Sequence, residues 1–178
     1  MSQIVETIKK LRELTGLGVI DCKKALQEAG NNIDRALEIL KEKGIKIAEK
    51  KEGKMTGEGL VGSYIHSNGK IGVLVEATCE SDFVARTDDF KELVKNICLQ
   101  IAATAPAYIK KEDIPDDVIE EKKKTYRDIE EFYREKVLFC QNFIKDDSLT
   151  VEQYVKSKIA KLGENIKITR FTRYQIGE

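Results

Sequence analysis

A predicted β-hairpin in the middle of the chain constrains the fold more than any other feature. Residues 60–66 and 70–80 alternate in polarity or are rich in β-branched side chains, and Ser67-Asn68-Gly69 separates them. An Asn-Gly pair between two such runs indicates a tight hairpin turn, because both residues tolerate positive φ angles. A third strand-like run, residues 166–176, lies far away in the sequence. We expect it to join the hairpin in a small antiparallel sheet, which gives an α+β fold.

Three helical patterns occupy the interval between these strands. The first, residues 87–104, is expected to bury one apolar face, formed by Phe90, Leu93, Val94, Ile97 and Ile101. Residues 116–142 form a highly charged helical region interrupted by large apolar side chains. Residues 150–162 open with a Thr-x-x-Gln capping box and are followed by a glycine, which predicts a helix with defined ends.

The beginning of the chain is punctuated by glycines and predicts three short helices. An apolar stripe marks the first helix, and the second, residues 19–29, is expected to point Ile20 inward. The third helix is expected to end at Gly44. Three helices of about ten residues with glycine turns resemble a ubiquitin-associated (UBA-like) bundle.

A charged segment then separates this bundle from the rest. Residues 41–54 are rich in Lys and Glu, which favours a linker, expected as a partly solvated helix, over a basic interaction arm. We therefore divide the chain into a UBA-like domain with its linker helix, residues 1–53, and an α+β core, residues 54–178.

The charge balance disfavours nucleic acid and membranes as direct partners. Lys and Arg together number 31, as do Asp and Glu, so no net field draws the chain onto a charged surface. The longest mostly apolar stretch, residues 97–109, is too short to span a bilayer. The first ten residues carry charged side chains among the aliphatic ones, unlike a signal peptide. These features predict a cytoplasmic protein.

The cysteines and the single histidine predict no metal site. Four cysteines lie far apart without a C-x-x-C pair, and His66 would have to join an unusual ligand set to bind zinc. We expect reduced, half-buried thiols. Cysteine-based catalysis would need Cys79 beside His66 across the hairpin, and a cysteine packed in a strand is the favoured alternative.

Other candidate sites have structural explanations. Residues 57–62 match G-x-G-x-x-G, but a charged linker precedes them and a strand follows, whereas a dinucleotide site needs a strand before and a helix after. Asp88-Asp89 is expected at a helix start and Asp146-Asp147 in a turn. We expect no catalytic residue and no cofactor.

The segment Ser81-Asp82-Phe83-Val84-Ala85-Arg86 has no such explanation. It lies where a strand passes to a helix, a place that is usually polar, yet Phe83 and Val84 directly follow an acidic residue. From the residues alone, burial of Phe83 in the core is the favoured interpretation, and outward presentation is the alternative.

Two stretches together resemble the elongation factor Ts family. Residues 11–16 (Leu-Arg-Glu-Leu-Thr-Gly) continue into residues 21–26 (Asp-Cys-Lys-Lys-Ala-Leu), and residues 76–86 (Glu-Ala-Thr-Cys-Glu-Ser-Asp-Phe-Val-Ala-Arg) form the second stretch. Residues 163–166 and 170–174 are also similar to family segments, so the resemblance covers nearly the whole chain. Ser81 stands where the family usually has Thr, and we expect it to preserve a hydroxyl-capped helix start.

The resemblance implies a guanine-nucleotide exchange factor without catalytic chemistry of its own, which releases GDP from elongation factor Tu and binds it in GDP-bound and nucleotide-free forms. In this family the bundle docks on the nucleotide domain of that partner, and an Asp-Phe pair reaches its magnesium and phosphate site. The partner-binding residues implied by motif position are Asp82, Phe83, Val84, Lys23, His66, Leu162 and Gly163.

The chain resembles the compact members of the family, which lack the second core subdomain and the inserted coiled coil and form homodimers through their sheets. A homodimer is therefore expected. The alternative function is a UBA-type interaction adaptor without exchange activity, which would have no use for Asp82 and Phe83.

Overall fold

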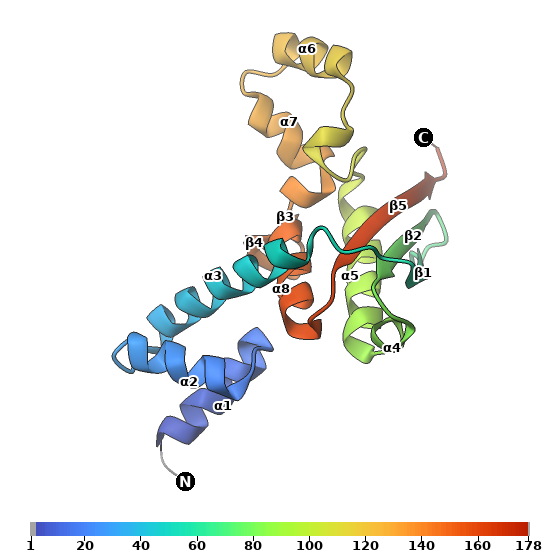
Figure 1. The fold of residues 1–178 in the computed structure, drawn as a ribbon. Coiled ribbons are helices and arrows are strands. Elements are labelled where there is room, and N and C mark those ends of the chain that lie inside the picture. The colour runs from blue at the N-terminus through green and yellow to red at the C-terminus, as the bar shows by residue number, and fades with distance from the viewer. Residues whose placement is uncertain (1–2, 178) are drawn as a thin grey trace.

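The computed structural model describes residues 3–177 and combines an N-terminal helical bundle, a three-stranded sheet with its covering helices, and a projecting arm (Figure 1). The mixed helix and sheet architecture confirms the predicted α+β class. In chain order the elements are α1 (Gln3–Thr15), α2 (Val19–Glu28), α3 (Ile33–Lys51), β1 (Glu58–Ile65), β2 (Ile71–Cys79), α4 (Asp82–Ala85), α5 (Asp88–Thr104), η1 (Lys111–Asp113), α6 (Asp116–Thr125), α7 (Ile129–Lys136), η2 (Leu138–Cys140), β3 (Asn142–Phe143), β4 (Asp146–Thr150), α8 (Val151–Leu162) and β5 (Ile166–Gln175).

The predicted hairpin and the distant last strand form one antiparallel sheet of order β1-β2-β5. At the hairpin turn, the Gly69 N–H donates to the His66 carbonyl at 2.7 Å, and Gly69 has a φ of 67°. Val75 in the central strand pairs with Gly62 on one side and with Phe171 on the other. The strand furthest away in sequence therefore lies directly beside the hairpin.

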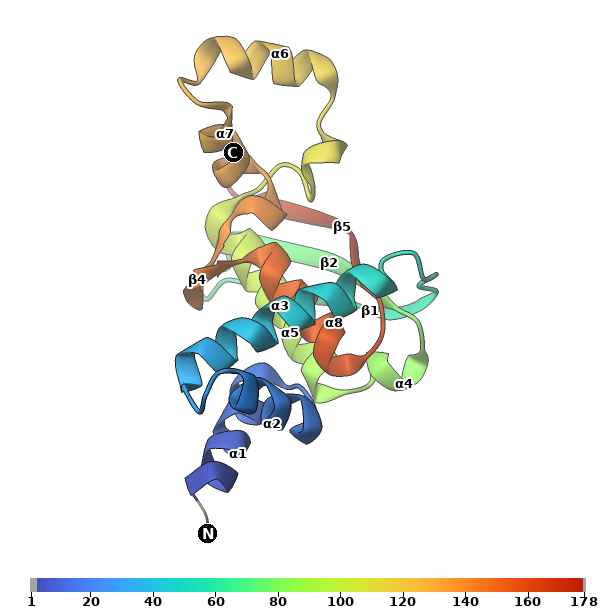
Figure 2. The ribbon, with the colours of Figure 1, turned by 60° about the vertical axis from the view of Figure 1, so that its left-hand side comes forward.

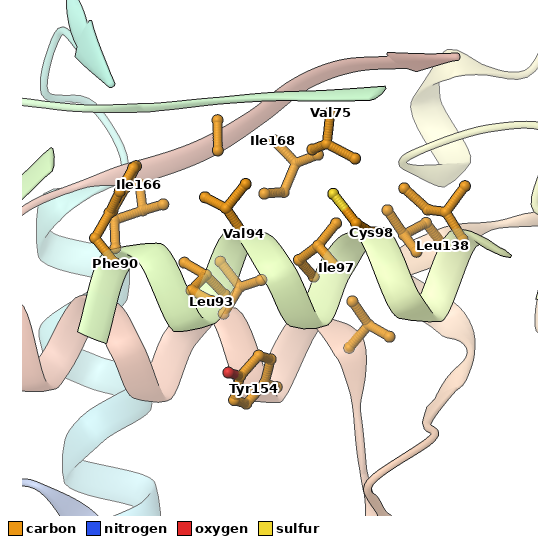
Figure 3. Close-up of a cluster of buried hydrophobic side chains, with 14 of the residues drawn as sticks. Val75, Phe90, Leu93, Val94, Ile97, Cys98, Leu138, Tyr154, Ile166 and Ile168 are labelled. Carbon is orange, nitrogen blue, oxygen red and sulfur yellow. The ribbon is translucent and has the colours of Figure 1, made fainter. Parts of the chain in front are cut away.

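Between residues 3 and 177, helices stack on only one face of this sheet. α5 lies against the sheet, α8 lies on the other side of α5, and α3 crosses over α8 (Figures 2 and 3). The predicted inward face of α5 is confirmed, because each of its side chains is buried: Phe90, Leu93, Val94, Ile97 and Ile101. Both predicted ends of α8 are also confirmed. Thr150 and Gln153 form the expected capping box at its start, and Gly163 follows its last residue with a φ of 74°.

Two expectations for the N-terminal bundle are wrong. α3 does not end at Gly44 but continues to Lys51, and Gly44 lies buried inside the helix, where it faces Ala160 of α8. Its backbone lacks the positive φ of a glycine that ends a helix, so it does not stop α3. Ile20 points outward and is 70% exposed, because it lies about 200° around the helix from the buried Cys22.

The region 116–142 is not one helical segment. It is divided into α6, α7, η2 and β3, and Asp128 caps the break by accepting a hydrogen bond from the Glu130 N–H. With the loop before it, this region forms the arm, which has a small core of its own around Ile114, Phe132 and Val137. The arm projects at the end of the molecule opposite the bundle (Figures 1 and 2). Asp146 and Asp147, expected in a turn, begin strand β4.

No helix described between residues 3 and 177 is long and apolar enough to cross a membrane. The four cysteines are free thiols. Three of them are fully buried, and burial raises the pKa of the Cys98 thiol to about 11.

Polar side chains join α5 to α8 at the edge of the core. The Lys158 ammonium, on a residue only 9% exposed, lies 3.0 Å from Asp89 and 2.7 Å from Glu92. Lys161 lies 2.6 Å from Asp89. Hydrogen bonds from Lys161 and then Lys158 lower the pKa of Asp89, and the bond from Lys158 lowers the pKa of Glu92.

This carboxylate network predicts acid sensitivity. Both folded-state pKa values lie below the ordinary values of 3.8 for Asp and 4.5 for Glu, so the network stabilises the fold fully above those values. The contribution is lost as the pH falls through the lowered pKa values. Urea unfolding at a series of acidic pH values should therefore show a shallower pH dependence for Asp89→Asn than for the parent chain. Asp88→Asn removes the neighbouring charge on the same helical turn and should keep the parental slope; equal slopes for all three chains would contradict the network.

The contact of Gly62 with α5 predicts an overpacking effect. A Cβ at Gly62 would overlap Cγ1 of the buried Val94. Gly62→Ala should lower the free energy of unfolding by about 1–3 kcal/mol, measured by urea titration. Gly57→Ala, which adds a Cβ with nothing within 4 Å, is the matched control. In the double variant Gly62→Ala/Val94→Ala the cost should fall below the sum of the two single costs, and strict additivity would argue against this contact.

Candidate partner-binding site

The corner between β2 and α5 is held by two successive helix caps. Ser81 precedes α4, and its hydroxyl oxygen accepts a hydrogen bond from the Val84 N–H at 3.4 Å. Thr87 precedes α5, accepts from the Phe90 N–H at 3.2 Å and donates its own hydroxyl to the Val84 carbonyl at 2.8 Å. The expected hydroxyl cap at Ser81 is confirmed. These bonds satisfy helix-end groups locally and leave the short segment few alternative conformations.

The corner turns one large apolar side chain into solvent. Phe83 is 81% exposed, whereas Val84 packs against the core and Ala85 is buried. Of the two sequence interpretations, outward presentation is therefore correct. Beside the ring, the Asp82 carboxylate lies 2.9 Å from the Arg86 guanidinium, on the surface of the same turn.

A pair of carboxylates ties this corner to the turn between α8 and β5. Glu164 accepts two hydrogen bonds from Ser81, one from the N–H at 2.9 Å and one from the hydroxyl at 2.6 Å. In return, Glu80 accepts the Asn165 N–H at 2.7 Å. We call this reciprocal arrangement of Glu80, Ser81, Glu164 and Asn165 the carboxylate clasp. Sequence reasoning missed it, because its two halves lie more than 80 residues apart.

Two of the other expected site residues lie beside the clasp. Leu162 and Gly163 end α8 immediately before Glu164, so the turn between α8 and β5 brings them to the corner that carries Phe83. Leu162 is partly buried against the core, and Gly163 is exposed. The hydrogen bonds between Glu164 and Ser81 bring them near the helical turn that contains Asp82 and Val84.

His66 is not brought to this region. His66 lies before the start of β2, and Phe83 lies after its end. The nine-residue strand, about 26 Å long, therefore separates the two residues. The His66 ring nitrogen Nδ1 instead lies 3.0 Å from the Tyr64 hydroxyl at the hairpin tip. The same distance separates His66 from Cys79, which pairs with Glu58 at the other end of the sheet and is buried. The favoured interpretation of a packed strand cysteine is confirmed.

Lys23 lies on α2 in the N-terminal bundle, next to an exposed apolar surface that sequence reasoning missed. Val19 and Ile20 precede it by four and three residues on the helix, so they share its face. Both are at least half exposed, as is Leu14 at the end of α1. The signal in the sequence was two large aliphatic residues in the first turn of α2, of which Ile20 lies on the side opposite the buried Cys22.

The glycine-rich segment 57–62 has a packing role and lies in and just before β1. A Cβ at Gly59 would overlap the backbone carbonyl of Ala77 in the neighbouring strand. No helix begins at the last glycine, so the segment lacks the helix N-terminus that would face a pyrophosphate.

Comparison with known proteins gives one consistent result. The family model for Elongation factor TS matches residues 2–129 and 127–178. Elongation factor Ts of Thermotoga neapolitana is 48% identical over 195 residues, which cover 100% of this chain and 99% of that protein. Elongation factor Ts of Coprothermobacter proteolyticus is 48% identical over 190 residues, or 96% of each chain. That of Fervidobacterium nodosum is 46% identical over 192 residues, 97% of this chain and 98% of the relative.

The matches extend over both the bundle and the core, including the corner that presents Phe83. The chain therefore belongs to the elongation factor Ts family of translation elongation factors.

Proposed function

We propose that the chain is the guanine-nucleotide exchange factor of elongation factor Tu, and that it inserts Phe83 and Asp82 beside the magnesium and phosphate site of that partner. The observation that carries this proposal is the exposure of Phe83 on a doubly capped corner. An aromatic ring held in solvent by a rigid turn contributes nothing to the core of its own chain. It is available for a cleft in another protein.

The energy of such an insertion is sufficient to weaken nucleotide binding. A buried aromatic anchor at a protein interface commonly contributes about 2 kcal/mol or more. That energy stabilises a partner conformation in which the ligands of magnesium and phosphate are displaced, so GDP dissociates faster. Linkage is reciprocal: if the exchange factor weakens GDP binding to elongation factor Tu, GDP weakens the binding of the exchange factor by the same ratio. In this mechanism no covalent bond is made or broken, and the chain needs no catalytic residue or cofactor.

The N-terminal bundle provides the second contact of the proposed complex. Lys23 shares one face of α2 with the exposed Val19 and Ile20, and this combination of apolar side chains and a cation is suited to docking on a protein. The partner is a protein of the translation machinery, so the proposed location is the cytoplasm, and neither nucleic acid nor membrane is a direct ligand.

Release of fluorescently labelled GDP from elongation factor Tu tests the role of Phe83. At limiting concentrations of the factor, Phe83→Ala should reduce the accelerated release rate by about thirtyfold, the equivalent of about 2 kcal/mol. The fold should persist, because the ring makes little contact with its own core.

Ile144→Ala removes another exposed apolar side chain, in the turn between β3 and β4, and should exchange like the parent. Parental activity in Phe83→Ala would refute the insertion mechanism. Binding without any acceleration by the parent chain would instead favour an interaction adaptor.

A homodimer is proposed on the uncovered face of the sheet. Among the described residues, helices cover one face of the sheet, and the other face displays a set of exposed apolar side chains: Val61, Ile65, Leu74 and Tyr174. Two such faces packed together would remove this surface from water. His66 lies at the hairpin tip, far from Phe83 of the same chain. In the proposed homodimer, a contact of His66 with elongation factor Tu is therefore separate from the contact that Phe83 makes.

Sedimentation velocity at micromolar concentration tests the dimer. The parent chain should sediment as a dimer and Leu74→Lys as a monomer, because a lysine in the middle of the packed faces would be buried without a partner. Ile144→Lys places the same charge away from the sheet and should leave the dimer intact. A monomeric parent chain would contradict the proposal.

A further inference from the structure

We propose that Glu164 is a positioning residue for Phe83: by accepting both hydrogen bonds of Ser81, it holds the corner in the orientation that presents the ring. This inference rests on the proposed exchange function. It assigns a role to a side chain outside the expected partner-binding residues, one that acts through Phe83 and not through direct contact with the nucleotide site.

The bonds of Ser81 connect Glu164 to the ring in two steps. The Ser81 hydroxyl donates to one oxygen of Glu164 at 2.6 Å while its oxygen accepts the Val84 N–H. The Ser81 N–H donates to the other oxygen of Glu164 at 2.9 Å. Both the position of Ser81 and the direction of its hydroxyl are therefore fixed by one carboxylate. Hydrogen bonds to an ionised acceptor are stronger than neutral ones, so this anchor restrains the first turn of α4, on which Phe83 lies.

The anchor itself is held from behind. Asn165, which is 2% exposed, donates from its side-chain amide to the carbonyl of Glu52 at 3.1 Å and to that of Lys54 at 2.8 Å. These carbonyls lie just after α3, the last helix of the bundle. Because the Asn165 N–H also bonds Glu80, the clasp cannot shift without breaking partly buried hydrogen bonds. Asn165 thus fixes the turn to the chain after α3, and its neighbour Glu164 fixes the Phe83 corner to the same turn.

The consequence for exchange is preorganisation. A ring on a loose corner would have to be ordered during insertion, at a cost in conformational entropy that reduces the energy left to displace the ligands of the nucleotide. Removal of Glu164 should therefore slow GDP release within the complex more than it weakens formation of the complex, because the docking surface around Lys23 is unchanged.

The test is a titration of the full-length factor against elongation factor Tu loaded with fluorescent GDP, with the saturating rate and the half-saturating concentration measured separately. Glu164→Ala should lower the saturating rate by about tenfold, the usual effect of losing a charge-assisted hydrogen bond, and leave the half-saturating concentration within about twofold. Glu164→Gln keeps one acceptor oxygen and should lie between Glu164→Ala and the parent.

Two further comparisons separate positioning from general loss of structure. Ser81→Thr keeps the hydroxyl and should exchange at the parental rate, whereas Ser81→Ala should lose several-fold. Amide hydrogen exchange should accelerate at Ser81 in Glu164→Ala while the amides of the buried helix α5 remain protected. If Glu164→Ala does not fold, the Ser81 pair carries the test alone.

The decisive measurement combines Glu164→Ala with Phe83→Ala. A residue that acts only through the ring adds no further loss once the ring is gone, so the double variant should match Phe83→Ala. Additive losses, or a change confined to the half-saturating concentration, would overturn the inference. If Phe83→Ala is slow but Glu164→Ala is parental, only the positioning role falls. If both are parental, the proposed function itself fails.

Discussion

The burial of α5 on two sides is the constraint on which the rest of the structure depends. Its side chains fill the space between the sheet and α8, with Val94 and Cys98 toward the strands and Leu93 toward Tyr154 (Figure 3). Each large side chain removed from water in this way contributes about 1.5–3 kcal/mol. A helix with both sides buried cannot rotate or slide, so its first residue is fixed in space. The corner that carries Phe83 directly precedes this helix and is hydrogen-bonded to its first turn through Thr87, so its position is fixed as well.

Much of the fold could be predicted from the sequence, because local chemistry specified it. The Asn-Gly turn, the capping box before α8 and the apolar face of α5 are signals contained within a few residues, and the structure contains all three. The errors arose where tertiary contacts decide. Gly44 is a helix stop by local rules, but it lies buried inside α3 and packs against Ala160 of α8, a residue more than 100 positions away. The residues on either side of the break between α6 and α7, Tyr126 and Ile129, likewise pack against the small core of the arm.

The candidate site was predictable to a different degree. The residue types at the corner did not decide between a buried and an exposed Phe83, and only the resemblance to a family favoured exposure. The clasp was not predictable, because a glutamate after a helix gives no sign that it will meet a serine from the other half of the chain. His66 was grouped with Phe83 by motif alone, and the length of β2 places them at opposite ends of the sheet.

The unbroken course of α3 past Gly44 has a mechanical consequence. At 19 residues it is a strut of about 28 Å that begins in the bundle and ends where the Asn165 side chain holds the chain. A break in the helix at Gly44 would have allowed the bundle and the core to change orientation relative to each other. Because α3 is continuous, it fixes the distance between the bundle, which carries Lys23, and the part of the core that holds the Phe83 corner.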